Sequence, residues 1–490
     1  MICLHTAAEV RAAEEPVLAA TPEGALMQRA AAGLASVGAR LLGSVYGRRV
    51  ALLVGSGGNG GDALFAGARL AGRGARVTAV LLDPARAHGA GLTALLRSGG
   101  RALPAGDPAS VPLVSRADLV LDGMLGIGGR GGLRPDAAAL ARAAGEGAGI
   151  TVAVDVPSGI DASTGAVEGD AFPAMHTDTF GAVKRGLVVG EGRGYAGEVH
   201  LVDIGIGPHL PAPTAWQLTD ADVAARLPSP GAGDDKYSQG VVGVLAGSAA
   251  YPGAGVLCTG AALRTRPGLV RYAGTAGERV RAAWPEAIVT EGGPSDAGRV
   301  QAWVVGPGGG TDDAARAVLA EVLATDVPVL VDADALTLLA REPDLVRGRG
   351  APTVLTPHDR EFARFGTAPG PDRIAAARRL AADLGAVVLL KGDATVVAGP
   401  DGRTFVNGTG TAELATAGTG DVLSGIAGAV LATGLDAVEA AAVSAHLHGR
   451  AGQLAARRGP LVAGDLVRRL PEAVGRVRGL VPATLEQSGA

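Results

Sequence analysis

A chain of 490 residues is longer than a typical single hydrophobic core and predicts at least two domains. Hydrophobic residues make up 47% of it and charged residues 19%, a balance that excludes a disordered chain. The formal net charge of −4 argues against a nonspecific nucleic-acid binder, which would carry a broad basic surface. Cys3 and Cys258 are the only cysteines, which excludes a disulfide framework and a CxxC metal site and fits a reducing cytoplasm.

Short apolar runs bounded by glycine or turn residues predict buried strands in the first half of the chain. These runs are residues 49–58, 75–83, 117–125 and 149–159. Segments with helical spacing lie between them, at 62–72 and 136–144. Near-continuous apolar strands that alternate with helices predict a three-layer α/β domain with a parallel sheet, which we place at residues 1–211. Ligands of such sheets bind beyond the carboxyl ends of the strands.

Five prolines between residues 208 and 230 interrupt this pattern and predict a linker at 212–234, with one short helix near 220–226. A second series of strands and helices predicts another three-layer α/β domain at 235–490. Its apolar runs are residues 240–248, 302–310, 327–336, 352–358 and 386–395.

The uncharged stretch 237–263 is long enough to cross a membrane. Pro252, Gly253 and the surrounding glycines divide it, so we expect a strand, a loop and the start of a helix instead. The first sixteen residues lack a basic region followed by an apolar run, and we therefore expect no signal peptide.

The first candidate site combines a glycine loop with polar residues at the ends of strands. The loop 55–62, GSGGNGGD, would let a ligand approach the backbone and the first amides of a helix, although a tight turn capped by Asp62 is an equally good interpretation. Asp122 and the segment Asp155-Val-Pro-Ser158 follow two other strands. Each alone would more often be a loop or cap residue. Together, Asn59, Asp122 and Ser158 could offer hard oxygen ligands to an alkali or alkaline-earth ion.

The motifs GSGGNGGDA, DGMLGIGGRGG, DVPSGIDASTG and TFGAVKRGL, in this order, resemble the Rossmann-like YjeF N-terminal family of NAD(P)H-hydrate epimerases over residues 1–210. The resemblance implies that K⁺ is bound by Asn59, Asp122 and Ser158. We expect Asp155 to move the proton, because a carboxylate in a cleft can be tuned for reversible transfer. Gly58 stands where the family has asparagine, from which we expect weaker binding. The implied contacts to the hydrated nucleotide are Gly58, Asn59, Gly60, Gly61, Asp62, Gly126, Ile127, Gly128, Gly129, Arg130, Gly131, Gly132 and Asp155.

In the second half, the segment 415–425, ATAGTGDVLSG, places Asp421 ahead of a long apolar run. Amides at the start of a helix can cradle phosphate oxygens, and an acid in that turn can accept a proton from an attacking hydroxyl. On this motif alone, a helix cap explains Asp421 equally well.

The second half also resembles the ribokinase-like superfamily, and more closely the ADP-dependent NAD(P)H-hydrate dehydratases, over residues 235–475. The motifs that carry this resemblance are residues 247–255, 261–270, 304–310, 331–336, 355–365, 389–397 and 407–425. It implies substrate contacts at Ala254, Gly308, Gly310, His358 and Asp421, and nucleotide contacts at Lys391, Gly392, Asp393, Ala394, Thr395 and Gly420. Asp359 and Arg360 replace a proline and a glycine of the family's turn, so the geometry of the loop at His358 is a departure from the family.

The two resemblances together imply repair of hydrated NADH and NADPH (NADHX and NADPHX). The first half would interconvert the R and S epimers, and the second would dehydrate the S form with ADP and Mg²⁺ to NAD(P)H, AMP and phosphate. We expect a homo-oligomer that binds neither nucleic acid nor membrane. Two alternatives remain open: a ribokinase-like kinase of a vitamin or sugar alcohol, and an N-terminal half that is a non-catalytic binding or scaffold module.

Overall fold

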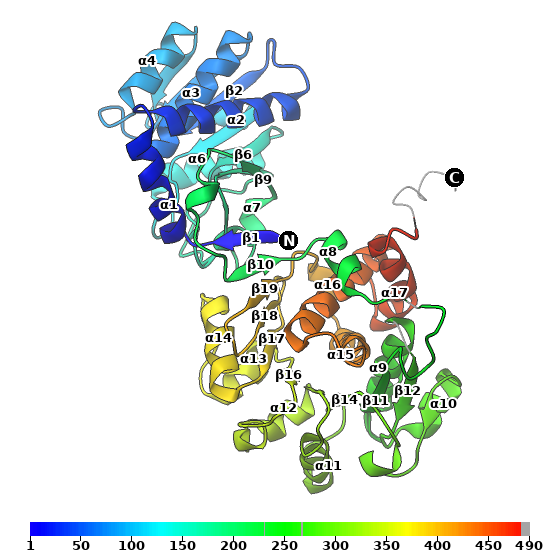
Figure 1. The fold of residues 1–490 in the computed structure, drawn as a ribbon. Helices are drawn as coiled ribbons and strands as arrows, with labels where there is room; N and C mark the ends of the chain where they lie inside the picture. Colours follow the sequence, from blue (N-terminus) through cyan, green and yellow to red (C-terminus); the bar gives the residue numbers. More distant parts are fainter. Residues whose placement is uncertain (230, 266–267, 482–490) are drawn as a thin grey trace. The chain divides into compact units, whose positions relative to one another are not determined.

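The computed structural model describes residues 1–229, 231–265 and 268–481 (Figure 1). The chain forms two compact units: residues 3–214 make up the N-terminal unit, and residues 215–490 with residues 1–2 make up the C-terminal unit. Both are α/β, as predicted. Pro230 of the predicted linker, Arg266 and Pro267 of the motif 261–270, and residues 482–490 of the predicted second domain lie outside the described residues.

The N-terminal unit is built on a seven-stranded sheet in the order β4-β3-β2-β5-β6-β7-β9, in which every pairing is parallel. The predicted strands are confirmed, because their runs of buried Val, Leu and Ala suit a sheet covered on both faces. The strand order reverses between β2 and β5, and ligands of such sheets bind at the carboxyl ends of the strands at this point. The strands are β2 (Arg49–Val54), β3 (Arg76–Leu81), β4 (Arg101–Pro104), β5 (Leu119–Gly123), β6 (Ile150–Val154), β7 (His176–Phe180) and β9 (Glu198–Val202).

Helices cover both faces of this sheet. Leu34 of α2 and Leu64 of α3 belong to the apolar core on one face, and Val114 of α5 and Leu140 of α6 to the core on the other. A further short pair, β1 (Ile2–His5) and β8 (Val183–Lys184), runs parallel outside the main sheet. The helices are α1 (Ala7–Ala20), α2 (Ala25–Leu42), α3 (Gly58–Gly72), α4 (Gly89–Arg97), α5 (Ser110–Ser115), α6 (Pro135–Glu146) and α7 (Arg193–Ala196).

The C-terminal unit contains the strand order β13-β12-β11-β14-β15-β16-β17-β18-β19-β10. Pairings are parallel from β13 to β17, antiparallel from β17 through β19, and parallel again between β19 and β10. The strands are β10 (Ala215–Gln217), β11 (Val241–Leu245), β12 (Leu269–Tyr272), β13 (Ile288–Val289), β14 (Ala302–Val305), β15 (Val329–Val331), β16 (Thr353–Leu355), β17 (Val387–Leu390), β18 (Val396–Ala398) and β19 (Thr404–Val406).

Figure 1 shows α9, α15, α16 and α17 on one face of this sheet and α11, α12, α13 and α14 on the other, which gives three layers. The apolar segment after Asp421 forms α15 and is buried along most of its length, as predicted. The bounds are α8 (Asp220–Arg226), α9 (Pro252–Thr265), α10 (Gly277–Ala283), α11 (Asp313–Leu323), α12 (Asp334–Leu339), α13 (Asp359–Phe362), α14 (Arg373–Leu384), α15 (Thr419–Leu431), α16 (Ala437–Ala456) and α17 (Ala463–Val477).

The segment expected to be a linker is partly folded into the C-terminal unit. Its short helix is confirmed as α8, but β10 pairs with β19, and Asp220 of α8 lies 2.6 Å from His446 and 2.9 Å from Arg450 of α16. A three-residue strand among prolines has too little apolar pattern to be recognised in the sequence.

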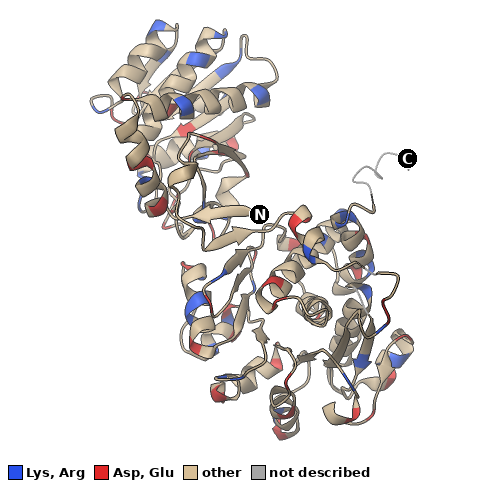
Figure 2. Ribbon diagram, in the orientation of Figure 1, with Lys and Arg blue, Asp and Glu red and all other residues tan. Residues whose placement is uncertain are grey.

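The stretch 237–263 forms β11, a loop and most of α9, which confirms the predicted division. Across the ranges that the structure describes, no helix is both long and apolar enough to span a membrane. Acidic and basic residues are interspersed on the helices of both units (Figure 2).

Candidate active sites

Asp62 lies inside α3 and does not cap it. The helix begins at Gly58 with Gly57 as its N-cap, so the cap interpretation of Asp62 is wrong. The Asp62 side chain is buried, and this burial, followed by the negative charges of Asp155 and Glu14, raises its pKa to about 8. Asp62 is therefore largely protonated at neutral pH and can donate a proton.

Asp122 and Ser158 are joined by hydrogen bonds at the ends of β5 and β6. Ser158 Oγ donates to Asp122 Oδ1 at 2.7 Å, and the Ser158 amide donates to Oδ2 at 2.8 Å. Burial, although opposed by these hydrogen bonds and one from Met124, raises the pKa of Asp122 to about 6. The hydrogen-bond donors that the structure describes around Asp122 are all neutral. When ionised, the carboxylate is therefore a buried negative charge, and none of these donors supplies a positive charge to balance it.

Asn59 converges on the same place through the backbone of Leu125. Its amide donates to the Leu125 carbonyl at 3.0 Å, while the Leu125 amide donates to Ser158 Oγ at 2.8 Å. A Cβ atom at Gly126 would lie 2.5 Å from Asn59 Oδ1, so the start of the loop 126–132 lies directly against this oxygen. The structure thus brings together the three residues predicted to bind a cation. Arg130 of the same loop is exposed.

Asp155 forms an ion pair with Lys184, a residue that the sequence prediction missed. Oδ1 of Asp155 accepts hydrogen bonds from Lys184 Nζ and, at 2.9 Å, from the Phe180 amide. The Lys184 side chain has no exposed area and also donates to the Phe180 carbonyl at 2.7 Å. Lys184 belongs to the TFGAVKRGL motif, which was the available signal.

Asp421 is the third residue of α15, and the cap interpretation of this residue is also wrong. The N-cap is Gly418, with φ of 86°, and it makes no side-chain capping bond. Burial, followed by the charge of Asp332, raises the pKa of Asp421 to about 6, with Lys391 opposing and Asp334 adding to the shift. A carboxylate with this pKa is mostly ionised at neutral pH and is well suited to act as a base.

Lys391 lies in a buried network beside Asp421. Its Nζ is 2.8 Å from Asp332 Oδ1 and 3.6 Å from Glu361 Oε2, and Ser424 Oγ donates to Asp332 Oδ2 at 2.7 Å. Burial alone would raise the pKa of Asp332, but the charge of Lys391 and these hydrogen bonds hold it below its usual value. A Cβ atom at Gly420 would lie 3.7 Å from Lys391 Nζ, so the ammonium group faces the first turn of α15.

The remaining residues predicted to contact nucleotide form a turn that is half exposed. Gly392 and Asp393 are exposed, whereas Ala394 and Thr395 are buried. Thr395 Oγ1 donates to the Gly392 carbonyl at 3.2 Å and closes the turn. The side chains of Ala394 and Thr395 are therefore buried, whereas Gly392 and Asp393 are open to solvent.

His358 caps α13 and is half exposed. Its Nδ1 accepts hydrogen bonds from the amides of Arg360 and Glu361 at 3.1 and 3.3 Å, and Glu361 Oε2 accepts one from the His358 amide at 2.9 Å. This reciprocal cap replaces the family's proline- and glycine-containing turn. Because Nδ1 accepts from the backbone, Nε2 is the ring nitrogen that can donate, and it lies 3.6 Å from Glu361 Oε1.

The predicted substrate residues Ala254, Gly308 and Gly310 also lie near the network of Lys391 and Asp421. A Cβ atom at Gly308, where φ is 60°, would lie 2.9 Å from the Cβ of Ala254. The Gly310 amide donates to Asp334 Oδ2 at 3.0 Å, and Asp334 is one of the charges that act on Asp421.

Comparison with known proteins supports two family assignments along the chain. A family model described as YjeF-related protein N-terminus matches residues 23–186, and one described as NAD(P)H-hydrate dehydratase matches residues 242–472. A bifunctional NAD(P)H-hydrate repair enzyme of Mycobacterium tuberculosis is 55% identical over 438 residues, which cover 88% of this chain and 90% of that protein. One from Mycobacterium leprae is 51% identical over 486 residues, which cover 98% of this chain and 99% of that protein. This chain belongs to the bifunctional NAD(P)H-hydrate repair enzyme family.

Among solved structures, the ADP/ATP-dependent NAD(P)H-hydrate dehydratase from Bacillus subtilis, co-crystallised with ATP/Mg²⁺, is 29% identical to this member of the repair-enzyme family. It covers 53% of this chain and 97% of its own length, with a TM-score of 0.48. A ribokinase-like superfamily protein from Enterococcus faecalis is 25% identical. The match covers 55% of this chain and 98% of that protein, with a TM-score of 0.49.

Both units of this repair-enzyme family member have one strained residue at the end of a central strand. Asp155 (φ of 68°) and Ala333 (φ of 51°) are the non-glycine residues with positive φ in the described parts of the chain. Asp155 pairs with Lys184, and Ala333 lies between Asp332 and Asp334. Strain of this kind costs about 1–3 kcal/mol and persists mainly at functional sites.

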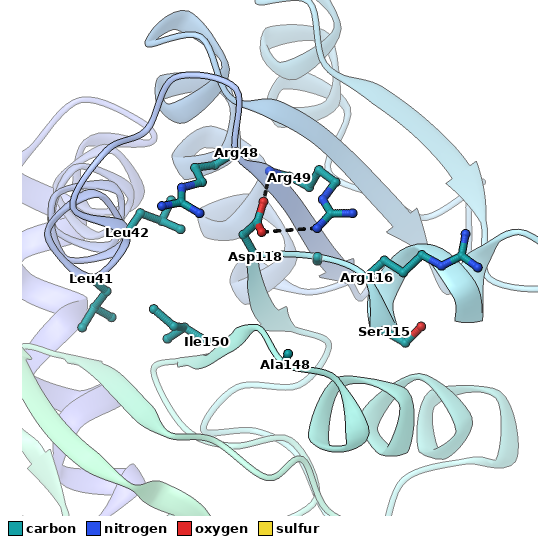
Figure 3. A pocket seen from close by; sticks show the side chains of 10 residues that line it. Leu41, Leu42, Arg48, Arg49, Ser115, Arg116, Asp118, Ala148 and Ile150 are labelled. Carbon is teal, nitrogen blue, oxygen red and sulfur yellow. Dashed lines mark hydrogen bonds and ion pairs between the residues drawn. The ribbon is translucent and has the colours of Figure 1, made fainter.

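A cavity of about 380 Å³ lies at the opposite, amino end of the N-terminal sheet (Figure 3). Within it, the Arg49 amide donates to Asp118 at 2.7 Å. None of the predicted site residues lines this cavity, so we assign it no part in the sites above. The lining residues are Leu41, Leu42, Arg48, Arg49, Ser115, Arg116, Ala117, Asp118, Ala148 and Ile150.

Proposed function

We propose that the N-terminal unit interconverts the R and S epimers of NADHX and NADPHX and that the C-terminal unit dehydrates the S epimer with ADP. The observation that carries the proposal is that each unit holds a buried carboxyl group with a pKa close to neutrality near the start of a helix, Asp62 in α3 and Asp421 in α15. Asp62 has a pKa of about 8 beside the Asp155–Lys184 pair, and Asp421 has one of about 6 beside Lys391. Groups with such pKa values can exchange protons at physiological pH.

For the epimerase, protonated Asp62 and the Asp155 carboxylate paired with Lys184 provide an acid and a base in one site. Asp62 donates a proton to the hydroxyl of the hydrated ring. The C–O bond then breaks and water departs, and the remaining ring is a planar cation stabilised by the ring nitrogen. Water adds to the opposite face, and Asp155 accepts the proton released. That proton returns to Asp62 through water, which restores both groups for the next turnover. Lys184 holds Asp155 in position through its buried ion pair. The exposed glycines at 57–58 and the loop 126–132 are proposed to bind the rest of the nucleotide.

We also propose that K⁺ binds to Asn59, Asp122 and Ser158. The support for this site is the buried Asp122 carboxylate, whose described donors are neutral, together with the hard oxygen donors around it. A potassium ion would supply the missing positive charge next to the substrate-binding loops.

For the dehydratase, Asp421 accepts the proton of the ring hydroxyl, and the hydroxyl oxygen attacks the terminal phosphorus of ADP. AMP leaves as the phosphate ester forms. The ring nitrogen then expels phosphate, and loss of a proton from the adjacent ring carbon restores the double bond of NAD(P)H. The amides of the first turn of α15, Gly420 among them, and the Lys391 ammonium face the transferred phosphoryl group in this arrangement.

Ala254, Gly308, Gly310 and His358 are proposed to bind the hydrated ring and its nucleotide, and Gly392 and Asp393 to bind ADP. In the described parts of the chain, the one group of three close His, Cys, Asp or Glu ligands lies elsewhere, at His176. Mg²⁺ would therefore be held largely by the phosphates of ADP, with one or two carboxylates such as Asp332 and Asp334 nearby, and would neutralise the developing charge.

The test is to incubate the full chain with a mixture of R and S hydrates, ADP, Mg²⁺ and K⁺ and to follow the absorbance of reduced nicotinamide. Complete conversion, with one AMP and one phosphate for each NAD(P)H, supports both activities. Conversion that stops near half rejects the epimerase, and a stable phosphorylated product would select the alternative kinase activity. We further propose that the protein is cytoplasmic, in keeping with its two free thiols. We also propose that it forms a homo-oligomer, which light scattering on the purified chain tests.

A further inference from the structure

We propose that the N-terminal unit binds a transition-metal ion of the Zn²⁺ type through His176, Glu198 and His200. Nδ1 of His176 lies 3.1 Å from Nε2 of His200 and 3.5 Å from Oε2 of Glu198. The three donor atoms all lie within 4.8 Å of one another. In a tetrahedral zinc site with bonds of about 2.0–2.1 Å, two ligand atoms are about 3.3 Å apart. The separations of 3.1 and 3.5 Å lie just below and just above this value, so His176 is spaced from each of the other two donors as ligands of one ion are.

The two strands place these donors on one face of the sheet. His176 begins β7 and is the register partner of Glu198 at the start of β9. Glu198 and His200 are two residues apart, and alternate residues of a strand share a face. The imidazole of His176 is only 16% exposed, whereas the Glu198 carboxylate is 69% exposed. The imidazoles are thus held by the sheet, and the carboxylate can close over an ion from the solvent side.

The donor set selects the class of metal. Imidazole nitrogen suits Zn²⁺, Cu²⁺ and Ni²⁺, whereas K⁺ and Mg²⁺ prefer oxygen ligands. The positive charge of Arg40 reaches His200 and opposes a cation, whereas the negative charge of Glu198 favours one. Water would complete the coordination, because β9 is the edge strand of the sheet.

This site is separate from the proposed epimerase site. His176 and Phe180 are the first and last residues of β7, and the Phe180 amide binds Asp155. Four steps along a strand cover about 13 Å. An ion at His176 would therefore link β7 to the edge strand β9 without contacting the residues proposed for epimerisation, and it would stabilise the folded unit by mass action.

The test uses the untagged, nucleotide-free full chain titrated with ZnCl₂ in a calorimeter, with thermal unfolding in parallel. We expect one Zn²⁺ for each chain and a higher midpoint of unfolding in its presence. Both effects should disappear in His176→Ala and His200→Ala. His209→Ala, which removes an exposed histidine of the same unit, is the matched control and should bind as the wild type does. Failure of the wild type to bind zinc, or unchanged binding in both histidine variants, would overturn the proposal and leave a simple hydrogen bond between the two rings.

A third variant covers the case in which the alanine variants do not fold. Glu198→Gln changes an exposed side chain and should leave the circular dichroism spectrum unchanged. It should weaken zinc binding by more than about 100-fold, the upper end of what loss of an outer-shell partner costs. It should also abolish the visible absorption that tetrahedral Co²⁺ gives in the wild type. Wild-type affinity in folded Glu198→Gln would exclude this three-ligand site, and neither readout depends on the proposed enzymatic activities.

Discussion

Lys184 and Asp155 form an ion pair in the interior of the N-terminal unit, where the Lys184 side chain is fully buried and that of Asp155 is 8% exposed. The pair connects the β7–β8 turn to the end of β6, because Lys184 also donates to Thr179 and to the Phe180 carbonyl. Two charges taken out of water are tolerated only while each has its partner. The pair therefore couples the folding of this unit to the position of the proposed base.

Lys184→Met should destabilise the N-terminal unit by about 3–5 kcal/mol, because it leaves the Asp155 charge buried and unpaired. Urea unfolding of the full chain measures this loss. The double variant Lys184→Met/Asp155→Asn should regain much of it, although it should not epimerise. Arg142→Met, which breaks the exposed pair with Asp170, is the matched control and should change stability by less than about 1 kcal/mol. Equal effects of Lys184→Met and Arg142→Met would contradict a buried pair.

Asp62→Asn should slow epimerisation by about 10²–10⁴-fold, because the amide cannot donate a proton. In the wild type, the epimerisation rate should fall as the pH rises through about 8, where Asp62 loses its proton. Circular dichroism of the R hydrate during racemisation gives the rate. Asp136→Asn, an exposed position at the start of α6, should retain the wild-type rate. A wild-type rate in Asp62→Asn would remove Asp62 from the mechanism.

The raised pKa of Asp62 also makes stability depend on pH. The folded pKa is about 8 and the reference value is 3.8, so the stability associated with protonated Asp62 is fully present below pH 3.8 and is lost as the pH rises to 8. Asp62→Asn does not titrate. We therefore expect the variant to gain on the wild type by up to about 1.4 kcal/mol for each pH unit across this window. Parallel free-energy curves for the two proteins between pH 5 and about 8 would show that the carboxyl is not perturbed.

Asp421→Asn should bind ADP and lose dehydratase turnover by about 10²–10⁴-fold. The wild-type rate should decrease as the pH falls through about 6, because Asp421 must be ionised to accept the proton of the hydroxyl. Fluorescence of recovered NAD(P)H follows the reaction, and calorimetry checks ADP binding. Asp313→Asn, an exposed acid at the start of α11, should behave as the wild type. Turnover near the wild-type level in Asp421→Asn would leave this residue with a structural role only.

Much of the fold could be predicted because the central strands, such as β2 and β5, are continuous apolar runs. Such runs are typical of a parallel sheet that helices cover on both faces. Segments whose structure depends on distant partners were missed. β10 is short and forms by pairing with β19. The start of α3 at Gly58 was placed too late because glycines are poor helix formers, and their use here depends on packing.

In the candidate sites, too, residues with a local sequence signal could be predicted, and residues that depend on distant partners could not. Asp155 and Asp421 could be picked out because they follow strands or glycine turns. Lys184 and Asp332 could not be assigned, although both belong to motifs with recognised order. Their importance comes from burial beside a partner that is remote in the sequence: Asp155 for Lys184, and Lys391 for Asp332. Periodicity carries no information about such pairs, and neither do the local rules for caps and turns.

The contact between α9 and α15 gives a last prediction, because it fixes the helix that carries Asp421. A Cβ atom at Gly425 would lie 2.2 Å from the Cys258 carbonyl oxygen in α9, which is backbone and cannot move aside. Gly425→Ala should therefore destabilise the C-terminal unit by about 1–3 kcal/mol and lower dehydratase turnover. Gly464→Ala in α17 is the control: its Cβ would approach only the end of Arg468, at 3.6 Å, and the change should be neutral or stabilising by up to about 1 kcal/mol. Thermal unfolding of both variants tests this prediction. Equal midpoints of unfolding for Gly425→Ala and Gly464→Ala would contradict it and would mean that α15 can shift away from α9 at little cost.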